Sequence, residues 1–249
     1  MSSAIFGMHA VFSLLENNRD NIEEVLLQDN YKKNKNLTSI FNIAKEYQIR
    51  ITVAPRKQLD DLCSKANHQG VVCLTSEPQK QYSENDLESI LDNIEGQPFL
   101  LILDQITDPH NLGACLRTAA AAGVQAVIAP KDGSASLTPV VAKISCGAAD
   151  TLPYIQVTNL SRTMKMLQAR GIWITGTSLD TDTSIYDADF KGAIAIVIGS
   201  EGSGMRRLVK ENCDFLVKIP IPGEMESLNA SVATGVCLFE AVRQRSSFQ

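Results

Sequence analysis

The sequence predicts an α/β protein whose larger part is built on a mainly parallel β-sheet. From residue 97 onward, short apolar runs typical of buried strands alternate with stretches typical of helices, as in strands joined by crossover helices. Three of these runs are followed at once by glycine, asparagine and other turn-forming residues. In open α/β sheets, nucleotide-like ligands bind where a strand passes into a helix, so these segments predict a ligand site.

Composition excludes several other classes of protein. The 249 residues are 44% hydrophobic and 20% charged, which is the balance of a globular protein with a buried core. The longest apolar runs are too short to cross a bilayer and no signal-like segment is present, so we expect no membrane partner and a cytoplasmic location. The six cysteines lack Cys-x-x-Cys spacing and neighbouring histidines, so we expect neither zinc nor disulfides.

The net charge of −5 argues against a nucleic-acid partner held by bulk charge. Two local basic clusters could compensate, although each is also consistent with ordinary solvated surface charge. The first cluster comprises Lys32, Lys33 and Lys35, and the second comprises Arg206, Arg207 and Lys210.

The first 75 residues predict a small α/β domain. The expected helices are at residues 9–16, 38–47 and 58–65, and the expected strands at 25–28, 50–54 and 71–74. Residues 76–88 are polar and nearly free of large apolar side chains, a composition typical of an interdomain linker. We therefore predict a first domain at 1–75, a linker at 76–95 and a second domain at 96–249.

The second domain should contain six strands and a closing helix. The strands are expected at residues 99–104, 126–129, 153–157, 172–176, 193–199 and 215–219. The closing helix should run from about residue 229 to residue 243. Its apolar residues recur three or four positions apart and should form one buried face. These residues are Val232, Val236, Phe239 and Val242.

Residues 198–205, with the sequence IGSEGSGM, follow an apolar run and contain Gly199, Gly202 and Gly204. Glycines here allow a ligand to lie against bare backbone. The spacing matches neither a P-loop nor the dinucleotide fingerprint G-x-G-x-x-G. A tight turn without a ligand would explain the glycines. It would not explain Glu201, whose carboxylate can accept hydrogen bonds from a ribose or orient a cation.

Two further segments carry polar side chains after a predicted strand. In residues 104–117 (DQITDPHNLGACLR), Asn111 is expected to cap the following helix, and Arg117 lies on that helix among small residues. The Arg117 side chain could extend along the surface or grip a phosphate, and the residues alone leave both readings open. In residues 219–233 (IPIPGEMESLNASVA), several polar residues stand at the start of the closing helix, more than one cap requires.

Together, DxxxDPxNxGxxxRTA, IGxEGxG and IPxxGxxxSLNxSxA, in this order, resemble the three signature motifs of the SpoU group of SPOUT RNA 2′-O-ribose methyltransferases. The segment from IFGMHAV to HQG near residue 70 is similar to the ribosomal-protein-like RNA-binding module of certain members of this group. Those members methylate a guanosine in the peptidyl-transferase P loop of 23S rRNA. The resemblance covers nearly the whole chain. It implies a C-terminal α/β domain with a trefoil knot and transfer of a methyl group from S-adenosylmethionine to the ribose 2′-hydroxyl of a specific guanosine. It also implies a homodimer, no metal and no DNA partner.

The resemblance also assigns roles to single residues. Contacts to S-adenosylmethionine are expected at Gly199, Ser200, Gly202, Ile219 and Leu228. The catalytic group is expected to consist of Arg117, Asn111, Glu201, Asn229 and Ser231. Because an arginine is essentially always protonated, we expect Arg117 to hold the adjacent phosphate and stabilise the developing alkoxide while the other four fix its orientation. The group that accepts the hydroxyl proton stays open.

Three alternatives to this function remain from the sequence. The same chemistry could act on tRNA or on another rRNA loop. A protein that kept the fold could serve as a non-catalytic RNA-binding factor in ribosome assembly, although the intact polar residues argue against it. A dinucleotide-dependent oxidoreductase would need fingerprint glycines that the chain lacks.

Overall fold

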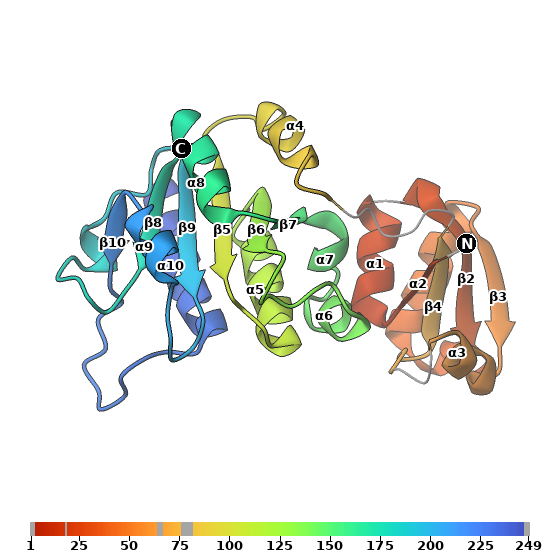
Figure 1. Cartoon of the computed structure of the whole chain (residues 1–249). Helices are drawn as coiled ribbons and strands as arrows, with labels where there is room; N and C mark the ends of the chain where they lie inside the picture. Colours follow the sequence, from red (N-terminus) through yellow and green to blue (C-terminus); the bar gives the residue numbers. More distant parts are fainter. Residues whose placement is uncertain (1–2, 18, 64–66, 76–81, 247–249) are drawn as a thin grey trace. The chain divides into compact units, whose positions relative to one another are not determined.

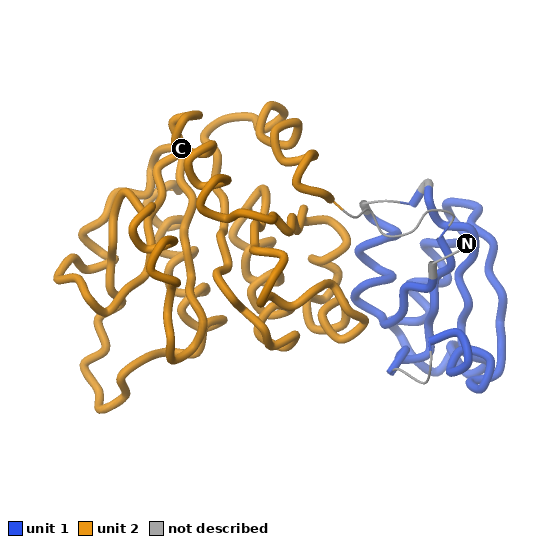
Figure 2. The backbone as a smooth tube through the Cα atoms, viewed as in Figure 1, with its two compact units in different colours: residues 1–81 blue, residues 82–249 orange. Residues whose placement is uncertain are grey.

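The computed structural model describes residues 3–17, 19–63, 67–75 and 82–246. The chain divides into two compact units, residues 1–81 and residues 82–249 (Figure 2). Each unit contains its own β-sheet. Among the described residues, no helix is both long enough and apolar enough to span a membrane.

The first unit is a four-stranded sheet with the order β1-β4-β2-β3 (Figure 1). Its strands are β1 (Ser3–Phe6), β2 (Ile22–Gln28), β3 (Arg50–Ala54) and β4 (Val71–Thr75). Its helices are α1 (Met8–Asn17), α2 (Lys35–Glu46) and α3 (Arg56–Leu62), with short 3₁₀ turns η1 (Arg19–Asn21) and η2 (Tyr31–Lys33). Helices α1 and α2 pack on one face of the sheet, and α3 packs on the other.

The predicted elements of this unit are present, and β3 has the predicted bounds. The end of the third helix, expected to reach residue 65, lies partly outside the described residues. We did not predict β1 (Ser3–Phe6). It becomes a strand by pairing antiparallel with β4, with Ile5 opposite Cys73.

The second unit is a six-stranded sheet with the order β10-β8-β9-β5-β6-β7, in which every pair is parallel. The strands are β5 (Phe99–Asp104), β6 (Ala126–Pro130), β7 (Tyr154–Val157), β8 (Trp173–Thr177), β9 (Ile194–Gly199) and β10 (Phe215–Val217). The helices are α4 (Asp86–Asp92), α5 (Pro109–Ala121), α6 (Pro139–Ile144), α7 (Ala148–Thr151), α8 (Leu160–Ala169), α9 (Arg207–Glu211) and α10 (Ala230–Ser246), with a 3₁₀ turn η3 (Ile185–Asp187). The predicted α/β class with a parallel sheet is confirmed, whereas the trefoil knot stays a prediction.

The strand order reverses at β5. The chain proceeds outward from β5 to β6 and β7, then crosses the sheet so that β8, β9 and β10 lie on the other side, with β9 inserted next to β5. In open α/β sheets the crevice at such a reversal, outside the carboxyl ends of the strands, is where ligands bind.

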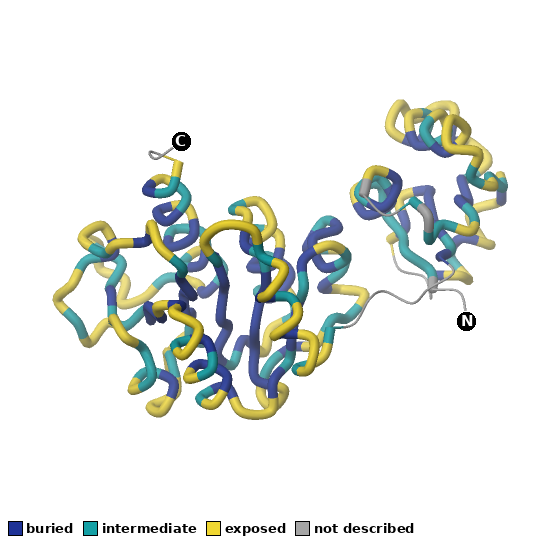
Figure 3. The backbone as a smooth tube through the Cα atoms, turned by 90° about the horizontal axis from the view of Figure 1, so that it is seen from above, coloured by how far each residue is buried: buried dark blue, intermediate teal, exposed yellow. Residues whose placement is uncertain are grey.

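The central strands of the second unit's sheet, β5, β6 and β9, are buried on both faces (Figure 3). Along β5, Phe99, Leu101 and Leu103 belong to the core under α5 and α10, while Leu100 and Ile102 belong to the core under α4 and α8. This two-sided burial explains why β5 reads as a continuous apolar run, since a strand covered on one face would alternate.

The buried face that we predicted for the closing helix is wrong for Val232 and Phe239, whereas Val242 is partly buried and packs against the core. In α10, Val232 and Phe239 are about half exposed, at 51% and 49%. The residues that face the core are instead Ala230, Thr234, Cys237, Leu238 and Ala241. Mostly small side chains on this face allow α10 to pack closely on α5, where a Cβ added at Gly235 would lie 3.8 Å from Cγ2 of Thr118. The helical period was right, but two of the four residues assigned to the buried face are exposed.

The segment that we predicted as a linker contains helix α4, while its residues 76–81 lie outside the described part. Leu87 and Leu91 of α4 are buried in the core of the second unit. Just before α4, Glu84 accepts hydrogen bonds from the backbone nitrogen and hydroxyl of Thr158 (3.0 and 2.8 Å) and from Arg162 (2.7 Å). The bonds from Thr158, and then Arg162, lower the pKa of Glu84 to about 2. This part of the segment is therefore held against the second unit.

Candidate active site

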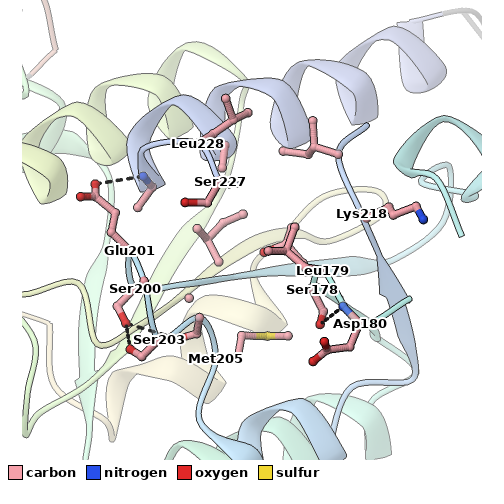
Figure 4. A pocket seen from close by; sticks show the side chains of 18 of the residues that line it. Ser178, Leu179, Asp180, Ser200, Glu201, Ser203, Met205, Lys218, Ser227 and Leu228 are labelled. Carbon is pink, nitrogen blue, oxygen red and sulfur yellow. Dashed lines mark hydrogen bonds between the residues drawn. The ribbon is translucent and has the colours of Figure 1, made fainter. Parts of the chain in front are cut away.

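A pocket of about 340 Å³ opens at the carboxyl ends of β8 and β9 (Figure 4). Three stretches of chain form its walls: the residues after β8, the glycine-rich turn after β9, and the loop that connects β10 to α10. All five residues for which we predicted cofactor contacts line this pocket. They are Gly199, Ser200, Gly202, Ile219 and Leu228.

The glycine-rich turn that follows β9 is closed on itself. The backbone nitrogen of Ser200 donates to the Gly204 carbonyl (3.1 Å), and the Gly204 nitrogen donates to the Ser200 carbonyl (2.9 Å). A Cβ at Gly199 would lie 2.2 Å from the carbonyl carbon of Gly204 and 2.3 Å from the nitrogen of Met205, so only glycine fits. Gly202 has φ +82° and Gly204 φ +66°, a region that favours glycine. The turn therefore presents bare backbone to the pocket.

Four of the five predicted catalytic residues meet in one hydrogen-bond network. Oε1 of Glu201 accepts from Nδ2 of Asn111 (2.8 Å), from Nδ2 of Asn229 (2.5 Å) and from the backbone nitrogen of Ala230 (3.1 Å). Nδ2 of Asn229 also contacts Oδ1 of Asn111 at 3.0 Å, and the Ser231 hydroxyl donates to Oδ1 of Asn229 at 2.6 Å. All three sequence motifs therefore contribute to a single cluster at the edge of the pocket.

Asn111 does not cap α5, contrary to our prediction. The helix begins at Pro109, and the side chain of Asp108 caps it by accepting from the backbone nitrogen of His110 at 2.9 Å. Asn111 lies in the first turn, so its amide is available for the network. At the start of α10, Asn229 performs the capping, with Oδ1 accepting from the backbone nitrogen of Ser231 at 2.9 Å.

Arg117, the fifth predicted catalytic residue, is not part of this network. Its side chain is exposed and makes no hydrogen bond or ion pair within the part of the chain that the structure describes. It follows Asn111 by six residues, which is about 9 Å along a helix axis. Within the described residues, Arg117 therefore makes no hydrogen bond to any of the other four.

The basic cluster beside the glycine-rich turn consists of paired side chains. Asp104, fully buried at the end of β5, accepts from the backbone nitrogen of Arg206 and from its Nε, both at 2.8 Å, and lies 2.8 Å from its Nη2. Lys210 pairs with Asp180 at 2.5 Å, and Arg207 with Glu211 at 2.8 Å. Arg206 thus anchors the glycine-rich turn to β5, a structural role that we did not predict.

We also did not predict the wall that follows β8. Ser178, Leu179 and Asp180 line the pocket, because β8 lies next to β9 in the sheet and their carboxyl ends meet. Met205 lines it as well, and a Cβ at Gly176 would lie 2.7 Å from Cε of Met205. The only signal for this wall in the sequence was its place after a predicted strand.

Cys115 joins the two helices behind the site. Its Sγ lies 3.3 Å from Oγ1 of Thr234, which links α5 to α10. Burial raises the pKa of the Cys115 thiol to about 11, so at neutral pH the thiol is protonated and serves packing.

Comparison with known proteins agrees with this geometry. Residues 98–239 match the model of the SpoU rRNA methylase family, and residues 4–81 match that of RNA 2′-O ribose methyltransferase substrate binding. The chain is 50% identical over 246 residues to the 23S rRNA (guanosine-2′-O-)-methyltransferase RlmB of Escherichia coli strain K12, covering 99% of this chain and 100% of that protein. It is 52% identical over 243 residues to RlmB of Shewanella oneidensis, covering 98% of each.

A solved structure with the same fold is the SpoU methyltransferase AviRb from Streptomyces viridochromogenes in complex with AdoMet. It matches with a TM-score of 0.76 at 24% identity, covering 99% of this chain and 91% of that one. The order of the three motifs and the parallel sheet are both consistent with the family model that the chain matches. The chain belongs to the SpoU rRNA methylase family.

Proposed function

We propose that this protein transfers a methyl group from S-adenosylmethionine to the ribose 2′-hydroxyl of a specific guanosine in 23S rRNA. The observation that carries the proposal is the meeting of Asn111, Glu201 and Asn229, one from each motif, beside a single pocket. The identity of about 50% to proteins named as 23S rRNA (guanosine-2′-O-)-methyltransferases, over nearly the whole chain, supports the substrate.

The pocket is suited to S-adenosylmethionine. Its volume is within the range of small-molecule sites, and it combines apolar walls with a few polar groups. Ile198, Ile219 and Leu228 offer apolar surface to the adenine, while the backbone at Gly199 and Gly202 can approach the ligand closely. When bound, S-adenosylmethionine supplies a methyl group on a positively charged sulfur.

The hydrogen-bond network of Asn111, Glu201 and Asn229 fixes the orientation of the Glu201 carboxylate at the polar edge of this pocket. Glu201 is held by three donors on Oε1, while its Oε2 has no partner among the described residues. Oε2 can therefore accept a hydrogen bond from an incoming hydroxyl or orient a cationic side chain. Because Asn111 and Asn229 are themselves held, the carboxylate needs little reorganisation when substrate arrives.

We further propose that the protein acts as a homodimer formed through α10. Val232 and Phe239 on α10 are about half exposed, and Val140 on α6 is 44% exposed. Val232 and Phe239 lie two helical turns apart on α10, and exposed apolar side chains on one helix face commonly mark an interface. Docking of a second copy would cover α10. Arg117, which has no described partner, could then act across the interface between the two subunits.

The function is tested by methyl incorporation from labelled S-adenosylmethionine into unmodified 23S rRNA transcripts and, in parallel, into bulk tRNA. A single 2′-O-methylguanosine in the 23S transcript is the expected product. Label in tRNA alone would overturn the substrate but keep the chemistry. Binding of S-adenosylmethionine without transfer to either RNA would favour a non-catalytic role.

The dimer is tested by analytical ultracentrifugation of the wild type and of Phe239→Glu. We expect a dimer for the wild type and a monomer for the variant, because a charge would be buried in the interface. Tyr186→Glu is the matched control, since Tyr186 is an aromatic residue on η3 with a similar exposed fraction, 55% against 49% for Phe239. A monomeric wild type, or a dimeric Phe239→Glu variant, would contradict the proposal.

A further inference from the structure

A second pocket, of about 420 Å³, opens at the carboxyl edge of the same sheet, beyond β6 and β7. The lining comes from three places: Pro130 at the end of β6 with Asp132 after it, Thr158 after β7 with Ser161 in the first turn of α8, and Arg206 and Arg207 at the start of α9. We propose that this pocket binds the RNA backbone next to the methylated nucleotide, with Arg206 and Arg207 holding a phosphate. The inference rests on the proposed function and names the RNA contacts of that site.

The two pockets share one continuous segment of chain. Gly199 to Met205 form a wall of the first pocket, and the next four residues, Arg206 to Val209, form a wall of the second. In RNA, every ribose has a phosphate on either side. An RNA whose ribose 2′-hydroxyl enters the first pocket must therefore place a phosphate close by. The second pocket provides cationic groups where the RNA backbone can continue.

Arg206 is positioned in advance for this role. Its Nε and Nη2 are held by the buried carboxylate of Asp104, while Nη1 has no partner in the described part of the chain, and the side chain remains 41% exposed. A guanidinium carries five N–H donors, so donors remain for a ligand. Because Asp104 already fixes the Arg206 side chain, binding a phosphate would cost little side-chain conformational entropy.

Arg207 is held much more weakly. Its side chain is 79% exposed, and its only described partner is Glu211, itself 52% exposed, one helical turn away. Exposed pairs of this kind contribute little to stability. A phosphate, which can accept two parallel hydrogen bonds from a guanidinium, is a stronger partner than Glu211.

Asp132 makes the pocket unlike a simple anion site. Its carboxylate lines the same cavity as the two arginines and would repel a free anion. A carboxylate can, however, accept a hydrogen bond from a ribose hydroxyl or from a base amino group. Donors for a phosphate beside an acceptor for a hydroxyl are the combination that a nucleotide within RNA requires.

The test measures RNA affinity as a function of salt. Filter binding of an unmodified 23S rRNA fragment is carried out over a series of KCl concentrations with the wild type, Arg207→Ala and Arg170→Ala. Arg170 is the control, because it is also a surface arginine in carboxylate pairs, but it follows the opposite end of α8. Loss of one phosphate contact should reduce the slope of log K against log[KCl] by about 0.7–0.9.

We expect Arg207→Ala to reduce that slope and to weaken RNA binding several-fold at low salt. We expect Arg170→Ala to behave like the wild type, and both variants to keep the wild-type affinity for S-adenosylmethionine, which also establishes that they are folded. A wild-type slope for Arg207→Ala would overturn the inference even if the wild type methylates the RNA. A reduced slope without methylation by the wild type would keep the inference and overturn the proposed function. A wild type that binds no RNA would overturn both.

Discussion

Replacing Gly199 by alanine tests the packing of the glycine-rich turn. The added Cβ would lie 2.2 Å from the carbonyl carbon of Gly204 and 2.3 Å from the nitrogen of Met205. Carbon atoms in contact are separated by about 3.5–4.0 Å, so this backbone must move by more than about 1 Å. Overpacking of this kind costs about 1–3 kcal/mol. For a domain of this size, a cost of about 2 kcal/mol lowers Tm by roughly 4–8 °C.

The same displacement should weaken cofactor binding. Gly204 and Met205 close the turn that carries Ser200 and Glu201, and all four residues line the pocket. A shift of about 1 Å would move the bare backbone that the cofactor is expected to contact. We expect the affinity for S-adenosylmethionine to fall at least tenfold, which corresponds to about 1.4 kcal/mol.

Differential scanning calorimetry and isothermal titration calorimetry measure the two effects separately. Gly192→Ala is the control, because a Cβ at Gly192 meets nothing within 4 Å and its φ is not in the left-handed region. The control should leave cofactor affinity unchanged. If Gly199→Ala matched the wild type in both Tm and affinity, the reasoning from backbone contact would be refuted.

Three further predictions concern other parts of the chain. Asp104→Asn removes the charge that holds Arg206 and should lower the free energy of unfolding by up to about 3 kcal/mol, the low end for a broken buried pair because Arg206 is 41% exposed; an unchanged urea midpoint would contradict this role. Arg117→Ala should abolish methyl transfer while leaving Tm and the affinity for S-adenosylmethionine unchanged, and wild-type turnover would remove Arg117 from the mechanism. Burial raises the pKa of Cys73 and Cys237 from 9.0 to about 12, so the folded state retains protons that the unfolded chain releases. Their contribution to stability should be complete below pH 9 and lost as the pH rises toward 12. Urea denaturation at pH 8 and pH 10.5 measures this loss, replacement of both cysteines by valine should reduce it, and an equal loss in that variant would be evidence against this origin.

Local patterns in the sequence were sufficient for the elements whose signal is contained within them. β5 was predicted with its observed bounds, because a strand buried on both faces must be apolar throughout. The turn at Gly199 was recognisable because a backbone that approaches other backbone closely requires glycine. The α/β class followed from the alternation of such elements.

Local patterns failed where the outcome depended on a distant neighbour. The helical period of α10 was visible, but which face is buried depended on the close approach of α5, and Val232 lies on the other face. Asn111 is a residue type that commonly caps helices, yet Asp108 is the N-cap of α5. Similarly, the charge of Arg206 was visible in the sequence, but nothing near it in the sequence indicated its pairing with Asp104.

By itself, the sequence determined the class of fold, most of the strands and the three motifs, because these depend on periodicity and residue type over a few positions. Only the tertiary structure decided the strand order, the wall formed after β8, and the network of Glu201, whose partners Asn111 and Asn229 are 90 and 28 residues away. The physical reason is that a hydrogen bond between distant residues forms only where the sheet brings their elements together, and no local pattern specifies which strands become neighbours.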